Sequence, residues 1–270
     1  MKPYYQDEWV TIYHGDCREI LPSLDKNNCP RCHGEGWYLH PVLGGDYEKA
    51  LCQHPEIDLV IADPPYETTK EHWDKDTINM EFSEIIFNIV KDSASLYVWC
   101  GIGELSQSII RWFPIFNHLW HFKDLITWKK SRGHGTRRGW LITREEIMWF
   151  VKDNKKFVWN SSFQYSDELR TFTATYKDKI KLAKYNQSVK SPYKRFANIW
   201  TDIREPNIGK HGKEVHKRGT WHYTPKPMKA INRIIKSHTE KNNLILDPFL
   251  GSGTTAHCAK QLNRKCIGIE

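Results

Sequence analysis

The sequence of 270 residues is long enough for one large α/β domain, or for one domain with a sizeable insertion. Hydrophobic residues make up 39% of it, and no repeat, low-complexity tract, membrane span or signal-peptide core is visible. These features exclude a membrane-spanning protein and predict a cytoplasmic one, in which the seven cysteines are metal ligands or buried thiols rather than disulfides.

The net charge of +8 is unevenly distributed. Of the 40 Lys and Arg residues, 16 lie in residues 152–218 together with 7 of the 32 Asp and Glu residues, which leaves 24 against 25 elsewhere. This one segment therefore carries the whole basic excess, and aromatic residues are interleaved with its charges. A solvated basic loop region would give the same counts, but the pattern favours a polyanionic partner, and nucleic acid is the expected one.

Strands and helices alternate along the sequence. Strands are expected in WVTIYHGD, which ends at Asp16, in EIDLVIAD, which ends at Asp63, at 95–101, at 124–130, at 145–152, in NNLILD, which ends at Asp247, and in CIGIE, which ends at Glu270. Helices are expected in REILPSL, at 81–92, at 103–113, at 227–237 and in AHCAKQLNR. The alternation predicts an α/β fold with a Rossmann-like, mostly parallel sheet and helices on both of its faces.

Two segments do not follow this alternation. Residues 27–55 separate the first strand and helix from the second strand, and the basic residues 153–220 lack a clean period. We interpret both as insertions projecting from one sheet, the second of them large enough to be a small domain. The catalytic domain is therefore expected to comprise residues 1–152 and 221–270.

The stretch Asp63-Pro64-Pro65-Tyr66 directly follows a predicted buried strand. Neither proline can donate to the sheet, and each restricts the residue before it to extended conformations. A carboxylate and an aromatic ring are therefore held just past the carboxyl end of a strand, where open α/β sheets bind their ligands. An ordinary turn would also explain the stretch if it stood alone.

A second motif, DPFLGSGTT, follows the strand that ends at Asp247. Its glycines, Gly251 and Gly253, allow the backbone to bend tightly at the start of a helix, whose free amides attract anionic groups. A P-loop would require a lysine after the last glycine, and a dinucleotide site a third glycine. Glu270 lies about twenty residues further on, where an acidic residue commonly binds ribose hydroxyls.

DPPY followed by DPFLGSGTT resembles the S-adenosylmethionine-dependent DNA amino-methyltransferases, in their circularly permuted β class. HYTPKPMKAINRII (222–235) and TREEIMWFVK (143–152) are also similar to segments of that family, and the resemblance covers most of the chain outside the two insertions. In an unpermuted methyltransferase the CIGIE-type strand precedes the VTIYHGD-type strand. Here the first closes the sequence and the second opens it.

The resemblance implies a set of residues for S-adenosylmethionine. Asp16 would lie near its adenine, although a Gly-Asp turn after a strand is also common for structural reasons, and Glu270 would accept from the ribose hydroxyls. Lys226 would border the carboxylate. The amino-acid part would lie against Asp247, Phe249, Gly251, Ser252, Gly253 and Thr254.

The resemblance also gives the Pro-bounded motif a mechanism. The Asp63 carboxylate and the Pro64 carbonyl would each accept an N–H bond from the exocyclic amine of the target base, so that its nitrogen attacks the sulfonium methyl group in line. Tyr66, which follows Pro65, would stack on a base flipped out of the duplex. In this family DPPY is more usual for adenine N6 and SPPY for cytosine N4.

We therefore predict a site-specific DNA adenine-N6 methyltransferase that acts on double-stranded DNA. The alternatives are cytosine-N4 methylation, RNA methylation and a non-catalytic DNA-binding protein on this scaffold. A homodimer and a cognate restriction endonuclease are further candidate partners.

The stretch KKSRGHGTRRG (129–139) is expected to form a basic loop after a strand on the catalytic side. Phosphate contacts are predicted for Lys129, Lys130, Arg132, Arg137 and Arg138. A mobile solvated loop is the alternative. Recognition of the target sequence is assigned to the insertion 153–220.

CPRCHGEG has the spacing of a zinc knuckle, which predicts a structural zinc site. The expected ligands are Cys29, Cys32, Cys52 and His54, with His33 or His40 as substitutes. Reduced, unpaired cysteines are the alternative. Four further cysteines, in strand or helix patterns, are expected to be buried: Cys17, Cys100, Cys258 and Cys266.

Overall fold

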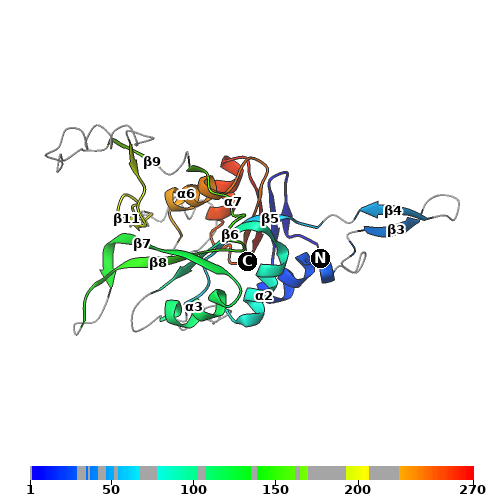
Figure 1. Ribbon diagram of the computed structural model, residues 1–270, viewed down its shortest axis with the longest axis horizontal. Helices are drawn as coiled ribbons and strands as arrows, with labels where there is room; N and C mark the ends of the chain where they lie inside the picture. The colour runs from blue at the N-terminus through cyan, green and yellow to red at the C-terminus, as the bar shows by residue number, and fades with distance from the viewer. Residues whose placement is uncertain are drawn as a thin grey trace.

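A nine-stranded mixed sheet forms the centre of the computed structural model, which describes residues 2–28, 35, 37–41, 47–51, 54–66, 78–101, 107–134, 139–161, 165–169, 193–206 and 225–270 (Figure 1). Its strands, in spatial order, are β1 (Tyr5–Gln6), β2 (Val10–Tyr13), β13 (Lys265–Ile269), β12 (Leu244–Asp247), β5 (Ile57–Ala62), β6 (Val90–Cys100), β8 (Ile142–Val151), β7 (His121–His134) and β11 (Ile199–Trp200).

Parallel pairing runs without interruption from β2 through β13, β12 and β5 to β6. β8 pairs antiparallel with both β6 and β7, whereas β11 is parallel to β7. β13 lies between β12 and β2, so that a strand late in the sequence is hydrogen-bonded to one of the first. This is the permuted strand arrangement predicted from the sequence, and the predicted Rossmann-like fold is confirmed.

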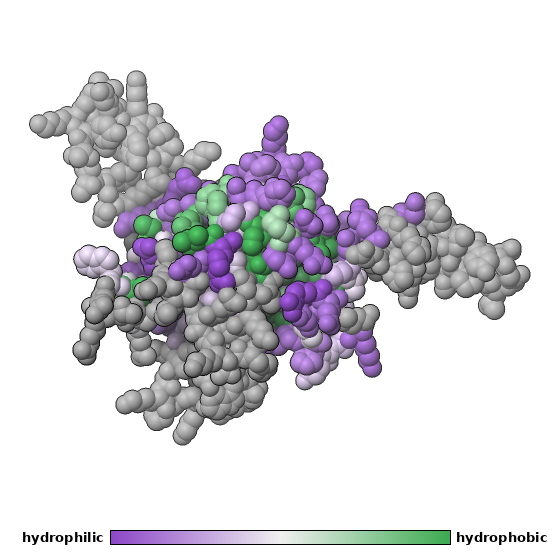
Figure 2. Space-filling view, turned by 90° about the horizontal axis from the view of Figure 1, so that it is seen from below, coloured by the Kyte–Doolittle hydropathy of each residue, from purple (hydrophilic) through white to green (hydrophobic). Residues whose placement is uncertain are grey.

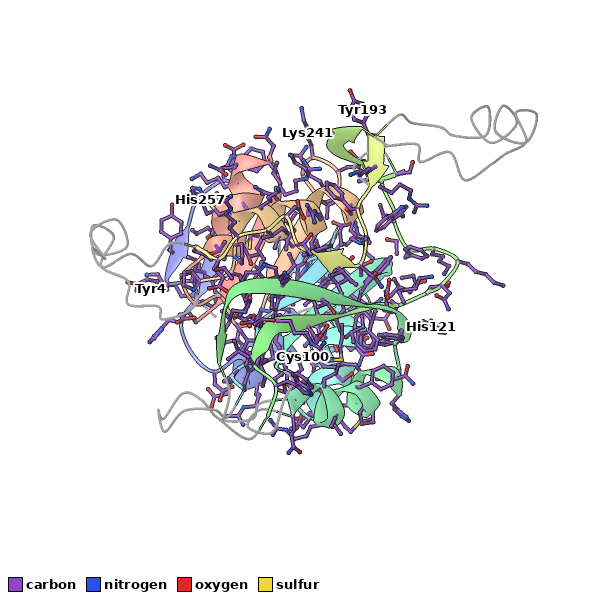
Figure 3. The ribbon with its side chains drawn as sticks, turned by 90° about the vertical axis from the view of Figure 1, so that its left-hand side faces the viewer. Tyr4, Cys100, His121, Tyr193, Lys241 and His257 are labelled. Carbon is purple, nitrogen blue, oxygen red and sulfur yellow. The ribbon has the colours of Figure 1, made fainter. Side chains whose placement is uncertain are left out.

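Helices cover both faces of the sheet (Figures 1 and 3). One face is covered by α1 (Cys17–Ile20), the short 3-10 helices η1 (Leu21–Leu24) and η2 (Lys26–Asn28), α2 (Met80–Ile89) and α3 (Ser108–Asn117). The other carries α6 (Met228–His238) and α7 (Thr254–Gln261). In α6 the buried residues Ile231, Ile234 and Ile235 recur at the spacing of one helix face, which is why this helix packs flat on the sheet.

Strands β5, β6 and β8 contribute side chains alternately to two apolar cores. Val60, Val98 and Met148 face the core beneath α2 and α3, whereas Ile61 and Ile147 face the core beneath α6 and α7. From below, hydrophobic residues gather toward the middle of the described surface and hydrophilic ones surround them (Figure 2). None of the helices in the described part combines the length and apolar character needed to cross a bilayer.

Two predicted helices have different limits in the structure. α2 ends at Ile89 rather than at Asp92, because Val90 pairs with Ile57 and begins β6. α3 begins at Ser108 and extends to Asn117, instead of spanning 103–113. Gln107 has φ 47°, a left-handed conformation that cannot continue a helix, so the helix starts directly after it.

Both predicted insertions contain a two-stranded antiparallel sheet of their own. In residues 27–55 the pair is β3 (Trp37–Pro41) with β4 (Tyr47–Leu51), and in 153–220 it is β9 (Tyr165–Leu169) with β10 (Tyr193–Arg195). The β3–β4 hairpin points away from the main sheet (Figure 1).

Both ends of the predicted insertion 153–220 pack on the main sheet, and its limits stay a prediction. Val158 N–H donates to the Ser93 carbonyl at 3.2 Å, and β11 pairs with β7. Trp200 is buried in the core beneath α6, and Asp202 forms an ion pair at 2.6 Å with Arg233 of that helix. These contacts join residues distant in sequence, so a period within the segment could not predict them.

Trp99 is expected to be a main determinant of stability, because it is fully buried in the core beneath α6. Its indole N–H has no hydrogen-bond partner within the described residues. Trp99→Ala should lower the free energy of unfolding by about 3–5 kcal/mol, whereas Trp99→Phe, which removes the unpaired donor and leaves a smaller cavity, should cost less than about 2 kcal/mol. Chemical denaturation checks both values, and equal losses for the two variants would contradict this account.

Candidate active site

The Pro-bounded corner and the glycine turn lie at the same edge of the sheet. β5 ends at Ala62 and runs directly into Asp63 and the buried Pro64. The neighbouring parallel strand, β12, ends at Asp247 and leads into the turn that starts α7. Because parallel neighbours end at the same edge, the topology brings together two motifs that are 184 residues apart, as Asp63 and Asp247 are numbered.

Both carboxylate oxygens of Asp63 are engaged. The Tyr66 hydroxyl donates to Oδ1 at 3.0 Å, and Lys226 Nζ lies 2.9 Å from Oδ2. The side chain of Asp63 is 25% exposed and that of Lys226 only 10%. The corner therefore presents a carboxylate whose direction is fixed from two sides.

Lys226 belongs to a row of four side chains whose charges alternate in sign: Asp63, Lys226, Glu145 and Lys130. Its ammonium lies 3.4 Å from Glu145 Oε2, and Lys130 Nζ contacts the other oxygen of Glu145 at 2.6 Å. Burial raises the pKa of Glu145, but the ammonium groups of Lys226 and Lys130 outweigh it and hold that pKa below its ordinary value. Burial likewise lowers the pKa of Lys226, and Asp63 and Glu145 reverse this shift. Glu145 and Lys226 are therefore both charged at neutral pH.

Aromatic rings lie beside this row of charged side chains. The Tyr66 ring lies 5.9 Å from that of Trp112 and 5.6 Å from Lys226 Nζ, measured to ring centroids. Phe249, which follows the glycine-turn strand, lies 5.5 Å from Phe82 of α2. Burial and the nearby Asp63 raise the pKa of the Tyr66 hydroxyl well above its ordinary value, so this hydroxyl keeps its proton and donates to Asp63.

The glycine turn is built from backbone conformations that favour glycine. Gly251 has φ 53° and Gly253 has φ 78°. Gly253 is the N-cap of α7 and makes no side-chain capping bond, and a Cβ atom placed there would meet no atom within 4 Å. The N-terminus of α7 thus faces open space, with free amides available to an anionic group.

Glu270 lies across this turn. Its Oε2 accepts a hydrogen bond from Gly251 N–H at 2.6 Å, and its backbone carbonyl accepts from Gly15 N–H at 3.0 Å. The carboxylate therefore stands at the end of β13, between the glycine turn and the Gly15 turn after β2. The role at the ribose hydroxyls that the resemblance implies for Glu270 stays a prediction.

Asp247 is a buried carboxyl group without a cation beside it in the described structure. Burial raises its pKa to about 7, and the negative charges of Asp63 and Glu270 act in the same direction. Phe249 N–H donates to its Oδ1 at 3.0 Å but does not offset the burial. A ligand with a positively charged amino group would supply the missing charge, and this requirement fits the amino-acid end of S-adenosylmethionine.

Comparison with known proteins identifies the family. The profile of the family described as DNA methylase matches residues 57–270, which is most of the chain. The chain belongs to this family, the S-adenosylmethionine-dependent methyltransferases of N6-adenine and N4-cytosine.

Two curated relatives of this methyltransferase are bacterial. Type II methyltransferase M.BglII of Bacillus subtilis is 30% identical over 269 residues, covering 94% of this chain and 70% of the relative. Type II methyltransferase M1.MboII of Moraxella bovis is 30% identical over 236 residues, covering 81% and 85%. Both relatives thus match over most of their own length.

Two solved structures share the fold. The M1.HpyAVI–SAM complex has a TM-score of 0.56 at 23% identity, covering 97% of this chain and 93% of the other. PvuII DNA methyltransferase, described as cytosine-N4-specific, has a TM-score of 0.61 at 18% identity, covering 100% and 84%. At these identities the likeness supports the fold of the methyltransferase, and not its choice of base.

Two of the predicted site residues make ion pairs that the sequence did not predict. Lys226 was assigned to the cofactor's carboxylate, but its ammonium contacts Asp63. Lys130 was assigned to DNA phosphates, but it pairs with Glu145. The reason is that β7 extends to His134, so that residues 129–134, predicted as a loop, are part of a ribbon with β8.

Asp16 lies at the predicted strand end but has a structural role in the described protein. Its Oδ1 accepts from Arg18 N–H at 2.9 Å, which caps α1, and its carboxylate also pairs with the Arg18 guanidinium. This side-chain pairing with Arg18 lowers the pKa of Asp16. A role for it at the cofactor's adenine stays a prediction.

Several predicted residues lie outside the described part of the structure. These are Arg137 and Arg138, the side chain of Arg132, and the proposed zinc ligands Cys29, Cys32 and Cys52. His54 is described, and no cluster of metal-ligating side chains is found among the described residues. The four cysteines expected to be buried, Cys17, Cys100, Cys258 and Cys266, are buried and unpaired.

Glu145 is the site residue that the sequence reasoning did not single out. It lies on β8 on the same side as Ile147, whose side chain faces the core beneath α6. A charged residue at an inward-facing position of a strand was the signal available, because such a residue needs a buried partner.

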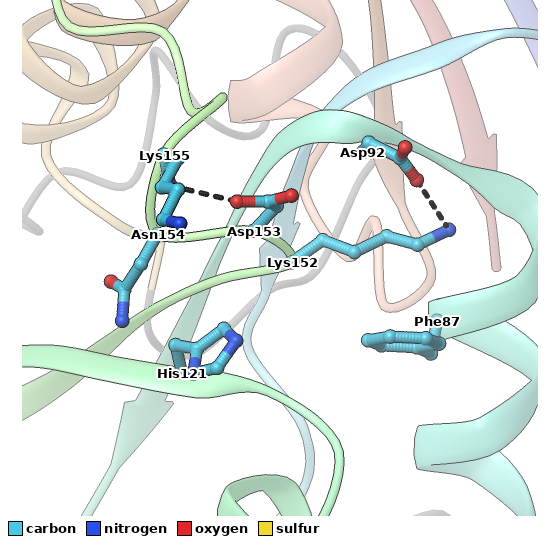
Figure 4. A pocket seen from close by; sticks show the side chains of 7 residues that line it. All are labelled: Phe87, Asp92, His121, Lys152, Asp153, Asn154 and Lys155. Atoms are coloured by element: carbon cyan, nitrogen blue, oxygen red, sulfur yellow. Dashed lines mark hydrogen bonds and ion pairs between the residues drawn. The ribbon is translucent and has the colours of Figure 1, made fainter.

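A surface hollow lined by Phe87, Asp92 and Lys152 lies at the other end of the sheet (Figure 4). There β6 begins and β8 has ended, whereas Asp63 lies beyond the carboxyl end of β5. Since ligands of open α/β sheets bind at the carboxyl ends of the parallel strands, this hollow is not part of the candidate active site.

Proposed function

We propose that this chain is a site-specific DNA adenine-N6 methyltransferase. The observation that carries the proposal is the placement of the Asp63 carboxylate, beside the Pro64 carbonyl, at the same sheet edge as the glycine turn and the buried Asp247. A target amine at this corner would meet two acceptors, while a cofactor on the turn would lie beside it.

The residues of the corner would do the following work. Asp63 and the Pro64 carbonyl accept one N–H bond each from the exocyclic amine, which frees the nitrogen lone pair from the ring and aims it. S-adenosylmethionine supplies an electrophilic methyl group on a positively charged sulfur. The carbon–nitrogen bond forms as the carbon–sulfur bond breaks, and the amine then loses one proton. Tyr66, after Pro65, would stack on the extruded base.

Cofactor binding is assigned to residues around the glycine turn. Asp247 would bind the amino group, and the free amides of the turn and of α7 would face the carboxylate. Glu270 would accept from the ribose hydroxyls, Asp16 would lie near the adenine, and Phe249, Gly251, Ser252, Gly253 and Thr254 would form the surrounding pocket.

Cytosine-N4 methylation is the second candidate. The structural likeness to PvuII DNA methyltransferase, a cytosine-N4-specific enzyme by its description, favours it. The DPPY motif favours adenine, and both bases offer an exocyclic amine to the same two acceptors. RNA methylation and a non-catalytic DNA-binding role have no comparable support.

For the DNA partner, phosphate contacts are proposed for Lys129, which is exposed on β7, and for Arg132, Arg137 and Arg138. Target recognition is proposed for the part of the basic segment between the two ends that pack on the main sheet. The type II names of the relatives support a restriction-modification setting, in which a cognate endonuclease and a homodimer are proposals. Structural zinc at Cys29, Cys32, Cys52 and His54 also stays a prediction.

The base is identified by a labelling experiment. The protein is incubated with methyl-labelled S-adenosylmethionine and PCR-amplified genomic DNA, which carries no N6-methyladenine or N4-methylcytosine, and the digested nucleosides are separated. We expect the label in N6-methyladenine. Label in N4-methylcytosine would select the second candidate. If neither nucleoside is labelled and an RNA substrate is not labelled either, both candidates are rejected.

A further inference from the structure

Lys226 occupies the acceptor that the proposed reaction needs. Asp63 has two oxygens, of which one accepts from Tyr66 and the other lies 2.9 Å from the Lys226 ammonium. An incoming exocyclic amine must donate to the same carboxylate, and an ammonium held against one of its oxygens competes with the amine for that acceptor. This inference rests on the proposed function, but it requires only that the substrate carries an amine, whichever base that is.

Lys226 has a second carboxylate within reach. Glu145 Oε2 lies 3.4 Å from its ammonium, and this oxygen is buried and makes no hydrogen bond within the described residues. Lys130 holds the other oxygen of Glu145 at 2.6 Å and so fixes the position of the carboxylate. A buried acceptor left without a hydrogen bond is costly, and a short movement of the ammonium would satisfy it.

The charges permit this movement. Asp63, Glu145, Lys226 and Lys130 together carry two negative and two positive charges, which a movement of Lys226 toward Glu145 leaves unchanged. The Tyr66 contact is less easily released, because Tyr66 is also held by its ring against Trp112. Lys226, with only 10% of its side chain exposed, cannot leave for solvent, so it needs a carboxylate in either position.

We propose that Lys226 is a positioning residue whose ammonium occupies two alternative positions, one against Asp63 and one against Glu145. It pairs with Asp63 in the free enzyme, and it transfers its hydrogen bond to Glu145 when the target amine enters. Glu145 is the receiving group, and Lys130 holds it in place.

Two variants test the exchange with opposite expected effects. Lys226→Met removes the competitor for Asp63, and Glu145→Gln removes the charge that receives Lys226 while keeping the size of the side chain. Lys91→Met is the matched control, because Lys91 forms a 2.8 Å ion pair with Asp58 on the same strand as the catalytic corner, but at its other end. Rates are measured with labelled S-adenosylmethionine and PCR-amplified genomic DNA.

Glu145→Gln should raise the KM for DNA about tenfold, because Lys226 then stays on Asp63, and it should leave the KM for S-adenosylmethionine unchanged. Lys226→Met should lower the KM for DNA, because no ammonium then competes with the target amine for Asp63. Lys91→Met should change none of these quantities.

Parallel changes in the KM for DNA in both variants would overturn the exchange. A raised KM for S-adenosylmethionine in Lys226→Met, with the KM for DNA unchanged, would instead place Lys226 on the cofactor. Glu145→Gln is nearly isosteric, so an unchanged KM for DNA in this variant overturns the proposal even if Lys226→Met does not fold. Failure of the proposed function is seen separately, as absence of methyl transfer by the unaltered enzyme.

Discussion

Replacing Asp63 by alanine is expected to lower kcat on DNA by about 100- to 1,000-fold, with the affinity for S-adenosylmethionine nearly unchanged. The carboxylate accepts one of the two N–H bonds that prepare the amine, and removing one preorganised partner of a reacting group has costs of this size. The cofactor residues around the glycine turn are not altered by the substitution. Methyl transfer under single-turnover conditions and calorimetric titration of the cofactor check the two parts.

Asp63→Asn provides the graded control. The amide oxygen can still accept one N–H bond, but it carries no charge and cannot pair with Lys226 at full strength. Its rate should therefore lie between those of the alanine variant and the unaltered enzyme. Full activity in Asp63→Ala would refute the assignment of this carboxylate, and equal loss of cofactor binding would show that the defect is not in the chemical step.

Asp247→Asn is expected to stabilise the cofactor-free protein at pH 8 and to weaken the binding of S-adenosylmethionine. The pKa of Asp247 is raised from 3.8 to about 7, so between these values the unfolded chain has lost the proton while the folded protein still holds it. Stability therefore falls as pH rises toward 7, by up to about 4 kcal/mol for a shift of about three units. An amide at this position does not ionise and avoids this loss.

Thermal or chemical unfolding at pH 5 and pH 8, with and without cofactor, measures both effects. The unaltered protein should lose stability between the two pH values and regain it with cofactor, whereas Asp247→Asn should change less in each case. At pH 5 and without cofactor, the two proteins should be more nearly equal. A variant that is less stable than the unaltered protein at pH 8 would contradict the proposed charge state of Asp247.

Much of this fold could be predicted because its elements carry local signals. The buried strands β5, β12 and β13 are short apolar runs that end at Asp63, Asp247 and Glu270, and α7 follows glycines that only a tight turn requires. The order of the strands in the sheet came from the resemblance to a permuted family. The limits of α2 and α3 could not be predicted, because they depend on the pairing of β6 with β5 and on the left-handed conformation of Gln107.

The least predictable part of the site was the pairing of its charges. Lys130 lies in a run of basic residues that suggests a phosphate-binding loop, and only the register of β7 against β8 shows that it faces Glu145. Lys226 precedes a helix and gives no sign in the sequence of reaching Asp63, 163 positions earlier as the two are numbered. Electrostatic partners that are distant in sequence are set by the tertiary structure, and composition does not encode them.

The alternation along β8 restricts how this region can change in length. Glu145 points toward Lys226, and the next residue, Glu146, points to the opposite face, where it accepts from the Thr127 hydroxyl and pairs with Arg144. Insertion or deletion of one residue beside them would turn every following side chain over and exchange the surroundings of the two glutamates. Only insertions or deletions of an even number of residues keep Glu145 on the face of β8 that points to the catalytic corner. Whether the number is even or odd therefore matters more here than how many residues are gained or lost.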